Sequence, residues 1–212
     1  DELLVDAEGR EVIFHGINAR IEGLFDVTFD DGRTALEPIP PFTEEDCRFI
    51  GEELGLNHLR LLVNWSGIEP NDDDFREDYL QRALDVAAMC ERHGVYSLID
   101  IHQDAFSKEI GEDGAPLWAI QPAPSMLLEG PLTDLGDRRL SAQVTAAFTT
   151  FFGDAAPGPM LRDRYAQMAA HVAARFTADD AVIGYDLYNE PVATDDQVRR
   201  VNEQTGAAIR AV

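Results

Sequence analysis

The chain has 212 residues, of which 45% are hydrophobic and 27% are charged, a composition typical of a globular domain large enough to bury a core. Forty acidic residues against seventeen basic ones give a formal net charge of −23, which repels phosphate backbones and argues against a nucleic-acid partner. No apolar run reaches the ~18 residues that a membrane span requires, so we expect no transmembrane helix.

The first part of the chain predicts a strand, a helix and a second strand. Residues 11–19 predict a buried strand with Asn18 near its end. Residues 43–54 predict a helix, because they open with the spacing of a capping box and carry an apolar face. Residues 58–65 predict a second strand, which is apolar enough to be covered on both faces.

The same order of elements then repeats. Residues 76–92 predict a helix with one apolar side, and residues 96–103 predict the third strand. Residues 161–176 predict a helix that leads into a short buried strand in residues 182–191. The strand is expected to end at its last residue, a proline, because proline cannot donate a hydrogen bond to a neighbouring strand. A last helix is expected over residues 194–212.

Four strands that are each followed by a helix predict a parallel sheet with right-handed crossovers. An open doubly wound sheet and a (β/α)₈ barrel both fit this order. No Gly-x-Gly-x-x-Gly follows the first strand, and polar residues follow all four strands, so the TIM barrel is favoured. A complete barrel needs eight such units in typically ~250 residues. Residues 1–212 are therefore predicted to be the N-terminal half of a catalytic (β/α)₈ barrel, with about its first four βα units.

One connection is far longer than the others. Residues 104–159 after the third strand are rich in Gly, Pro and Asp, and only residues 140–151 have a helical pattern. Loops of this length usually carry function or are disordered. This insertion leaves the expected catalytic edge of the sheet, and its apolar side chains could equally line a groove or fold the insertion onto itself. They are Phe106, Trp118, Ile120, Met126 and Leu127.

Polar and aromatic side chains gather at the ends of the predicted strands. Carbohydrate hydrolysis needs such a set, because amides and charged groups bind hydroxyls, aromatic faces bind sugar rings and a carboxylic acid protonates the glycosidic oxygen. A purely structural interpretation stays open, in which the charged members only anchor packing. The set contains Asn18, Arg60, Asn64, Trp65, His102, Gln103, Asp104, Asn189 and Glu190.

Several motifs together resemble the clan A glycoside hydrolases of family five. There are five, namely residues 8–12, Gly16-Ile17-Asn18 and residues 59–65, 100–104 and 185–191. The last two are most similar to the endoglycosylceramidase branch and its endogalactosylceramidase relatives. The resemblance implies a (β/α)₈ barrel, retaining hydrolysis by two glutamates, release of an intact glycan from ceramide, and secretion from the cell.

The resemblance also implies roles for individual residues. Glu190 matches the general acid/base, with its pKa raised by burial and by the nearby nucleophile, and Asn189 matches the residue that bonds the sugar 2-hydroxyl. Arg60 matches the positively charged residue that keeps the nucleophile ionised. His102 and Asp104 match sugar contacts, and Asn18, Trp65 and Trp118 are further candidates for substrate binding. The family's nucleophilic glutamate lies on the seventh strand, so it is expected outside this chain, in the same protein or in a cleaved second chain.

The expected partner is a glycolipid or oligosaccharide substrate, through which the protein could touch a membrane surface peripherally. No cofactor or metal is expected, because His102 and Asp104 are too few for a zinc site and no His-Glu-x-x-His is present. Two alternatives remain. One is a family-five polysaccharide hydrolase, a β-glucanase or β-mannanase, and the other is a non-catalytic carbohydrate-binding half barrel.

The two cysteines, Cys47 and Cys90, fall within expected helices and lack a Cys-x-x-Cys spacing. They therefore predict neither a metal site nor a disulfide framework, and two buried thiols are favoured over a bridge between them. Cysteine usage leaves the redox compartment open.

Overall fold

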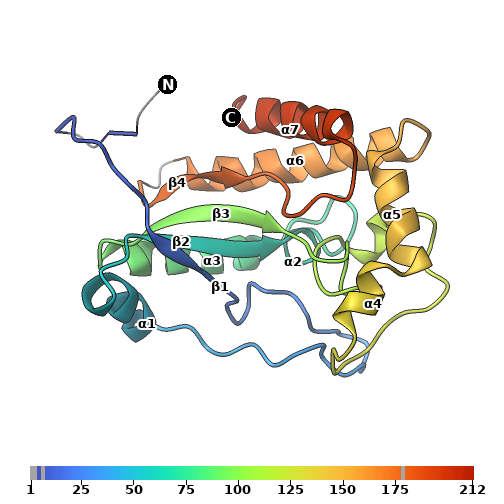
Figure 1. Cartoon of the computed structure of the whole chain (residues 1–212), viewed down its shortest axis with the longest axis horizontal. Helices are drawn as coiled ribbons and strands as arrows, with labels where there is room; N and C mark the ends of the chain where they lie inside the picture. Colours follow the sequence, from blue (N-terminus) through green and yellow to red (C-terminus); the bar gives the residue numbers. More distant parts are fainter. Residues whose placement is uncertain (1–3, 6–7, 178–179) are drawn as a thin grey trace.

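The computed structural model describes residues 4–5, 8–177 and 180–212. Its centre is a parallel sheet in the order β1-β2-β3-β4 (Figure 1). Each strand lies beside the next one along the chain, as right-handed crossovers produce. The predicted parallel sheet is confirmed. Its strands are β1 (Gly16–Ala19), β2 (His58–Asn64), β3 (Tyr96–His102) and β4 (Val182–Asp186).

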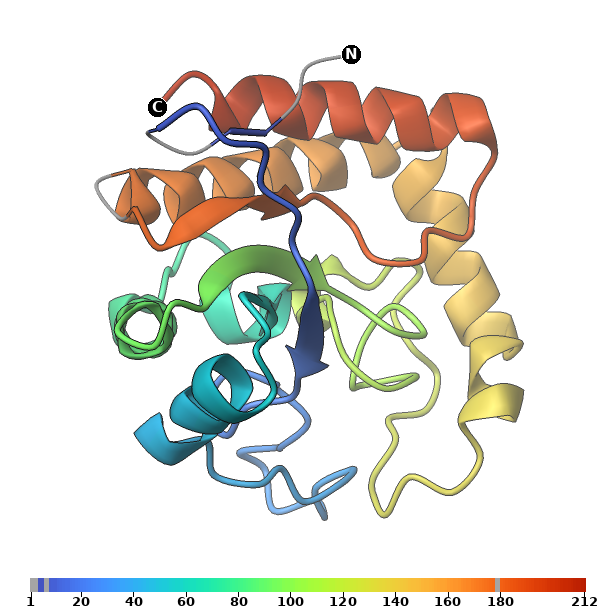
Figure 2. The same cartoon turned by 60° about the vertical axis from the view of Figure 1, so that its left-hand side comes forward.

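The helices lie mainly along one face and at one end of this sheet. The long helices α3 and α6 pack on the same face, and α7 lies on the outer side of α6 (Figures 1 and 2). No helix in the described residues is long and apolar enough to cross a membrane. The helical elements are α1 (Glu44–Arg48), a π-helix (Phe49–Glu53), α2 (Trp65–Ile68), α3 (Glu77–Glu91), a 3₁₀-helix (Leu117–Ala119), α4 (Leu135–Arg139), α5 (Ala142–Phe152), α6 (Gly158–Phe176) and α7 (Asp195–Ile209).

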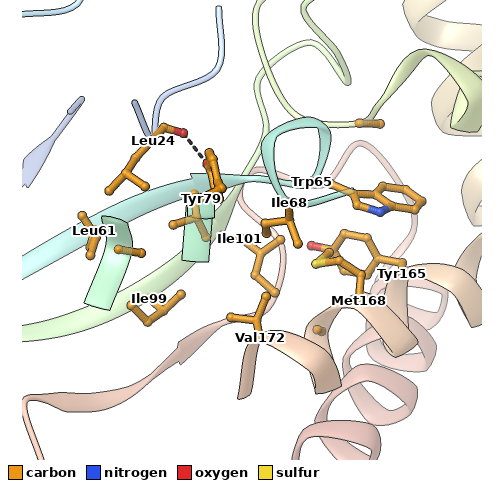
Figure 3. Packing of buried hydrophobic residues seen from close by; sticks show 14 of the residues in the cluster. Leu24, Leu61, Trp65, Ile68, Tyr79, Ile99, Ile101, Tyr165, Met168 and Val172 are labelled. Carbon is orange, nitrogen blue, oxygen red and sulfur yellow. Dashed lines mark hydrogen bonds between the residues drawn. The ribbon is translucent and has the colours of Figure 1, made fainter. Parts of the chain in front are cut away.

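The core follows from the alternation of side chains along the two central strands. Leu61 of β2 and Ile99 and Ile101 of β3 point toward the helices, where Met168 and Val172 of α6 meet them (Figure 3). The Tyr79 hydroxyl of α3 donates a hydrogen bond to the Leu24 carbonyl, which ties the loop after β1 to this core (Figure 3). The residues between them on each strand face the opposite side of the sheet, and these include the polar residues of the candidate site.

The first and last strands differ from the prediction. β1 begins at Gly16 instead of residue 11, and β4 ends at Asp186 instead of running to Pro191. Neither is buried as expected: Ile17 is 37% exposed and Ile183 is 39% exposed. The reason is their position, because β1 and β4 are the two edges of the described sheet and each pairs on one side only. Apolar composition alone did not reveal this.

The predicted helix starts are close to the observed ones. Thr43 and Thr194 form the expected capping boxes of α1 and α7. The helix predicted over residues 43–54 changes to π-helical geometry at Phe49, and the helix predicted from residue 161 begins earlier, at Gly158. In the insertion at residues 104–159, the helical pattern predicted at residues 140–151 corresponds to α5, and the preceding helix α4 was not predicted.

Cys47 and Cys90 form a disulfide, so the preference for two free thiols was wrong. The bridge joins α1 to α3, whose Cα atoms at these positions lie 4.8 Å apart. The two helices flank β2 in the chain and pack on the same side of the sheet, which brings the cysteines together across a separation of 43 residues. Sequence spacing could not show this proximity.

We expect the disulfide to contribute strongly to stability. Closing a loop of 43 residues lowers the entropy of the unfolded chain, so the double substitution Cys47→Ala and Cys90→Ala should lower the free energy of unfolding by about 4 kcal/mol. Urea denaturation of the oxidised protein, the reduced protein and the double variant measures this. A midpoint that is the same in all three would contradict the prediction.

Candidate active site

Arg60 is the centre of a polar network on the sheet face opposite the helices. Its Nη2 atom donates to Asp186 Oδ2 at 2.6 Å and to Asn189 Oδ1 at 2.9 Å, and lies 3.1 Å from Asp100 Oδ2. Arg60 belongs to β2, Asp100 to β3 and Asp186 to β4, and the last two are paired in register. One guanidinium group therefore connects three neighbouring strands to the loop that carries Asn189.

Asn189 and Glu190 lie in the loop after β4, three and four residues beyond its last residue, Asp186, so they are not part of the strand itself. Hydrogen bonds from side chains hold this loop in place of the backbone hydrogen bonds of a strand. The Asn189 Nδ2 atom donates to the Gln103 carbonyl at 3.0 Å, and Gln103 Nε2 donates to the carbonyls of Asn189 and Glu190. Tyr165 of α6 donates to the Leu187 carbonyl at 2.8 Å. The loop is therefore held by the residue that follows β3 and by a residue of α6.

Glu190 has an unusual backbone conformation and an open side chain. Its φ angle of +40° lies in the left-handed region, which is costly for a residue with a Cβ atom and is concentrated at functional sites. Its side chain is exposed. The burial that the resemblance implies for this carboxyl group is therefore not found among the described residues, in which β4 is an edge of the sheet.

His102 lies beside Arg60 at the end of β3. Its Nδ1 atom is 2.7 Å from Asp100 Oδ2, and its ring lies 6.1 Å from the ring of Phe25. Burial raises the pKa of Asp100, and the hydrogen bond with His102 opposes that rise. The structure thus brings together three residues that the sequence singled out, namely Arg60, His102 and Asn189.

Asp104 and Asn18 lie at the margin of this network. Both carboxylate oxygens of Asp104 are held by Arg139 of α4, with Nε at 2.7 Å from Oδ1. The hydrogen bonds with Asp104 raise the Arg139 pKa, and the negative charges of Asp104 and Glu190 raise it further. Asn18 is exposed on β1, in register with Arg60. Substrate contacts by Asp104 and Asn18 stay predictions.

The two tryptophans lie in an aromatic cluster instead of in the Arg60 network. Trp65 begins α2, is almost fully buried, and contacts the rings of Trp118, Phe151 and Tyr165. Its Nε1 atom donates to Glu69 at 2.8 Å. A ring without an exposed face cannot stack on a sugar, so the expectation for Trp65 is corrected to a packing role. Trp118 is partly exposed, and its substrate contact stays a prediction.

Sequence reasoning missed two carboxylates and one cation of the site, namely Asp100, Asp186 and Arg139. A usable signal was present for the first two, because each interrupts an otherwise apolar strand at a position that faces away from the helices. Arg139 gave no such signal, since it comes from a helix within the long insertion.

A second buried group of acids lies behind Asp104. Asp113 is fully buried and accepts a hydrogen bond from Asn64 Nδ2 at 2.6 Å. Burial raises the pKa of Asp113 well above its usual range, and the negative charges of Glu112 and Asp104 raise it further. Glu112 is also buried and pairs with Arg20 at 3.0 Å. Within the described part of the chain, no three His, Cys, Asp or Glu residues are arranged to hold a metal ion.

A hollow of about 620 Å³ lies between the loop after β1 and the start of α3, where Glu22, Asp26 and Arg76 line it. It contains neither Glu190 nor Asn189. The geometry of the strand ends and their hydrogen bonds, and not the size of this hollow, therefore locates the candidate site.

Comparisons with known proteins agree with this geometry. The family model described as cellulase (glycosyl hydrolase family 5) matches residues 5–212. An endoglycoceramidase of Cyanea nozakii is 29% identical over 212 aligned residues, which cover 91% of this chain and 41% of that protein.

Solved structures give the same result. The crystal structure of an endogalactoceramidase matches with a TM-score of 0.81 and 29% identity, covering 98% of this chain and 48% of that one. Endo-glycoceramidase II from Rhodococcus sp., in a complex with ganglioside GM3, matches with a TM-score of 0.81 and 27% identity, covering 100% of this chain and 49% of that one. The chain thus spans about half the length of these relatives, and its sheet corresponds to about the first four βα units of their (β/α)₈ barrel.

Proposed function

This chain belongs to the cellulase family, glycosyl hydrolase family 5, and we propose from that premise that it carries the acid/base half of a retaining endoglycosidase. The observation that carries the proposal is the placement of Asn189 and Glu190 beside Arg60 at the carboxyl edge of the parallel sheet. Active sites of (β/α)₈ barrels lie at this edge. The bond cleaved is proposed to join the glycan to the ceramide of a glycosphingolipid.

Glu190 is proposed as the general acid/base. In the first step its carboxylic acid gives a proton to the glycosidic oxygen as the bond to the sugar breaks and a second carboxylate forms a bond to the sugar. In the second step the Glu190 carboxylate takes a proton from water, and that water releases the sugar from the nucleophile. Its exposed position leaves room for a leaving group and for water on its outer side.

Asn189 is proposed to hold the sugar 2-hydroxyl. Its Oδ1 atom accepts from Arg60 and its Nδ2 atom donates to Gln103, which fixes the amide plane. An amide has a second hydrogen on Nδ2 and a second lone pair on Oδ1. These are available to a hydroxyl, and such a contact strengthens in the transition state.

The nucleophilic glutamate is proposed to come from the other half of the barrel, outside these 212 residues. Retaining hydrolysis needs two carboxyl groups ~5–5.5 Å apart. A second half that pairs with β1 and β4 would also cover Ile17 and Ile183. A relative of known structure supports the chemistry, because endo-glycoceramidase II from Rhodococcus sp. has been solved as a lactosyl-enzyme intermediate.

A glycolipid substrate is supported by the names of these relatives and by the surface of the insertion. Leu117, Met126, Leu127 and Leu140 are exposed there, Leu140 to 83%. Gln143 links this part of the insertion to α5, since its side chain bonds the backbone of Ser125 and Met126. Apolar side chains near the catalytic edge suit a ceramide tail, and peripheral contact with a membrane surface would follow from such a substrate.

We expect the complete enzyme to prefer glycosylceramides in detergent over soluble oligosaccharides of the same sugar. Burying about four methylenes of the lipid, at ~0.8 kcal/mol each, corresponds to a preference on the order of 10²-fold in kcat/KM. Initial rates on a glycosylceramide and on its free glycan linked to a short alcohol measure the ratio. Equal or faster cleavage of β-glucan or β-mannan would favour the polysaccharide hydrolase, and glycan binding without turnover would favour a binding protein.

Secretion is the proposed localisation. The Cys47–Cys90 disulfide supports it, because disulfides form and persist in oxidising compartments and are rare in reducing ones.

A further inference from the structure

Asp100 is a buried carboxylate to which the proposed mechanism gives no role. It lies in the centre of β3 with 0% exposure. Its Oδ2 atom is 2.7 Å from His102 Nδ1 and 3.1 Å from Arg60 Nη2. Its Oδ1 atom is buried and has no hydrogen-bond partner among the described residues.

A carboxylate in this position is costly to stability. Removing a charge from water without full hydrogen bonding is unfavourable, and an apolar side chain of similar volume often packs there at no loss. Asp100 has only one of its two oxygens satisfied. The two groups on that oxygen, His102 and Arg60, are both expected to act on the substrate or the nucleophile, which gives the carboxylate a use in the site.

We propose that Asp100 is a positioning residue that fixes the proton of His102 on Nδ1, so that Nε2 is left as a hydrogen-bond acceptor for a sugar hydroxyl. This inference rests on the proposed function for the identity of the ligand. The reason is chemical: an ionised carboxylate only accepts hydrogen bonds, so the ring nitrogen that faces it must donate. Neutral imidazole then carries its lone pair on the other nitrogen.

The surroundings of His102 hold the ring in this orientation. Its backbone carbonyl accepts a hydrogen bond from Asn64 Nδ2 at 3.1 Å, and Phe25 packs against the ring. No residue in the described ranges makes a hydrogen bond to Nε2. Asp100 also holds Arg60 from the β3 side while Asp186 holds it from the β4 side, so one carboxylate positions both neighbours.

Asp186 offers a matched control. Its carboxylate bonds the same Arg60 Nη2 atom at 2.6 Å, and its side chain is 35% exposed. The substitution Asp186→Asn removes a negative charge that contacts Arg60 but not the His102 ring. The substitution Asp100→Asn removes a negative charge that contacts both Arg60 and the His102 ring. An effect of the lost negative charge beside Arg60 would appear in both variants. A change in the His102 tautomer would appear only in Asp100→Asn.

The test is nitrogen-15 NMR of the histidine rings in the complete barrel at neutral pH, which reads protonation without any turnover. The wild type and Asp186→Asn are expected to show His102 as the Nδ1–H tautomer, and Asp100→Asn is expected to shift it toward Nε2–H. A wild-type His102 that is protonated on Nε2, alone or together with Nδ1, would overturn the proposal. Because this result comes from the wild type, it does not depend on whether Asp100→Asn folds.

Kinetics give an independent test. Losing a hydrogen bond to a charged group corresponds to about a 10- to 100-fold fall in kcat/KM for Asp100→Asn. If Asp100 acts in part through His102, Asp100→Asn should slow the His102→Gln variant by a smaller factor than it slows the wild type. Effects that add in full would overturn the proposal. An inactive wild type with the expected tautomer would contradict the proposed function and leave the role of Asp100 in place.

Discussion

Replacing Glu190 by glutamine is expected to slow cleavage of a natural glycosylceramide by about 10²–10⁴-fold, the usual contribution of a general acid. The amide keeps the shape of the side chain but has no proton of suitable acidity for the leaving oxygen. A substrate with an activated leaving group, such as a dinitrophenyl glycoside, needs no such proton. Its kcat/KM should therefore stay within a few-fold of the wild-type value, because kcat/KM reports the first step.

The second step supplies a further readout. Glu190→Gln also lacks the base that activates water, so the covalent intermediate should accumulate on the activated substrate and kcat should fall. Azide needs no base, and its addition should restore kcat. Glu91→Gln is a matched control, since Glu91 is an exposed residue at the end of α3. An equal loss on natural and activated substrates would exclude Glu190 as the acid.

The sequence predicts the order of the four strands and three residues of the candidate site. Parallel strands bring their carboxyl ends to one edge, so the sequence predicts that His102 and Asn189 lie together. Arg60 lies four residues before the end of β2, and its long side chain still reaches Asn189. The apolar alternation of β2 and β3 also separated the helix-facing side chains from the polar ones. These features depend on local pattern and on the topology that the pattern implies.

Features that depend on distant contacts could not be predicted in the same way. Glu190 lies in a left-handed loop because Gln103 and Tyr165 bond the backbone around it, and neither partner is near it in the chain. Trp65 follows a strand as a substrate-binding residue would, yet the helices α5 and α6 supply rings that enclose it. The Cys47–Cys90 bridge has the same origin.

Whether a strand lies at the edge of the sheet is a further property that composition does not predict. Ile17 and Ile183 predict buried strands by residue type, and they would be buried in a closed barrel. Their exposure therefore marks the two places where the proposed second half of the barrel would pair. Each edge also presents unpaired backbone groups, which makes the half barrel prone to aggregation by itself.

Residues 1–212 alone are expected to show no retaining hydrolysis. The acid Glu190 without a nucleophile cannot form the covalent intermediate, so the rate should fall to the uncatalysed background, a loss of at least ~10⁶-fold against a working enzyme. The experiment compares this chain alone with the same chain combined with the other half of the barrel, supplied as a continuous polypeptide or as a second chain. Native mass spectrometry against the 23.5 kDa of this chain shows which species is present.

The two outcomes separate the structural and chemical parts of the proposal. Activity that appears only in the larger species, and that Glu190→Gln in this species removes, places the nucleophile in the other half and the acid in this one. Activity from the 23.5 kDa chain by itself would instead require a nucleophile among its own residues, and the division of the two glutamates between halves would then be wrong. A larger species that binds glycans yet never cleaves them would contradict the enzymatic proposal, because the arrangement of Arg60, Asn189 and Glu190 would then serve binding alone.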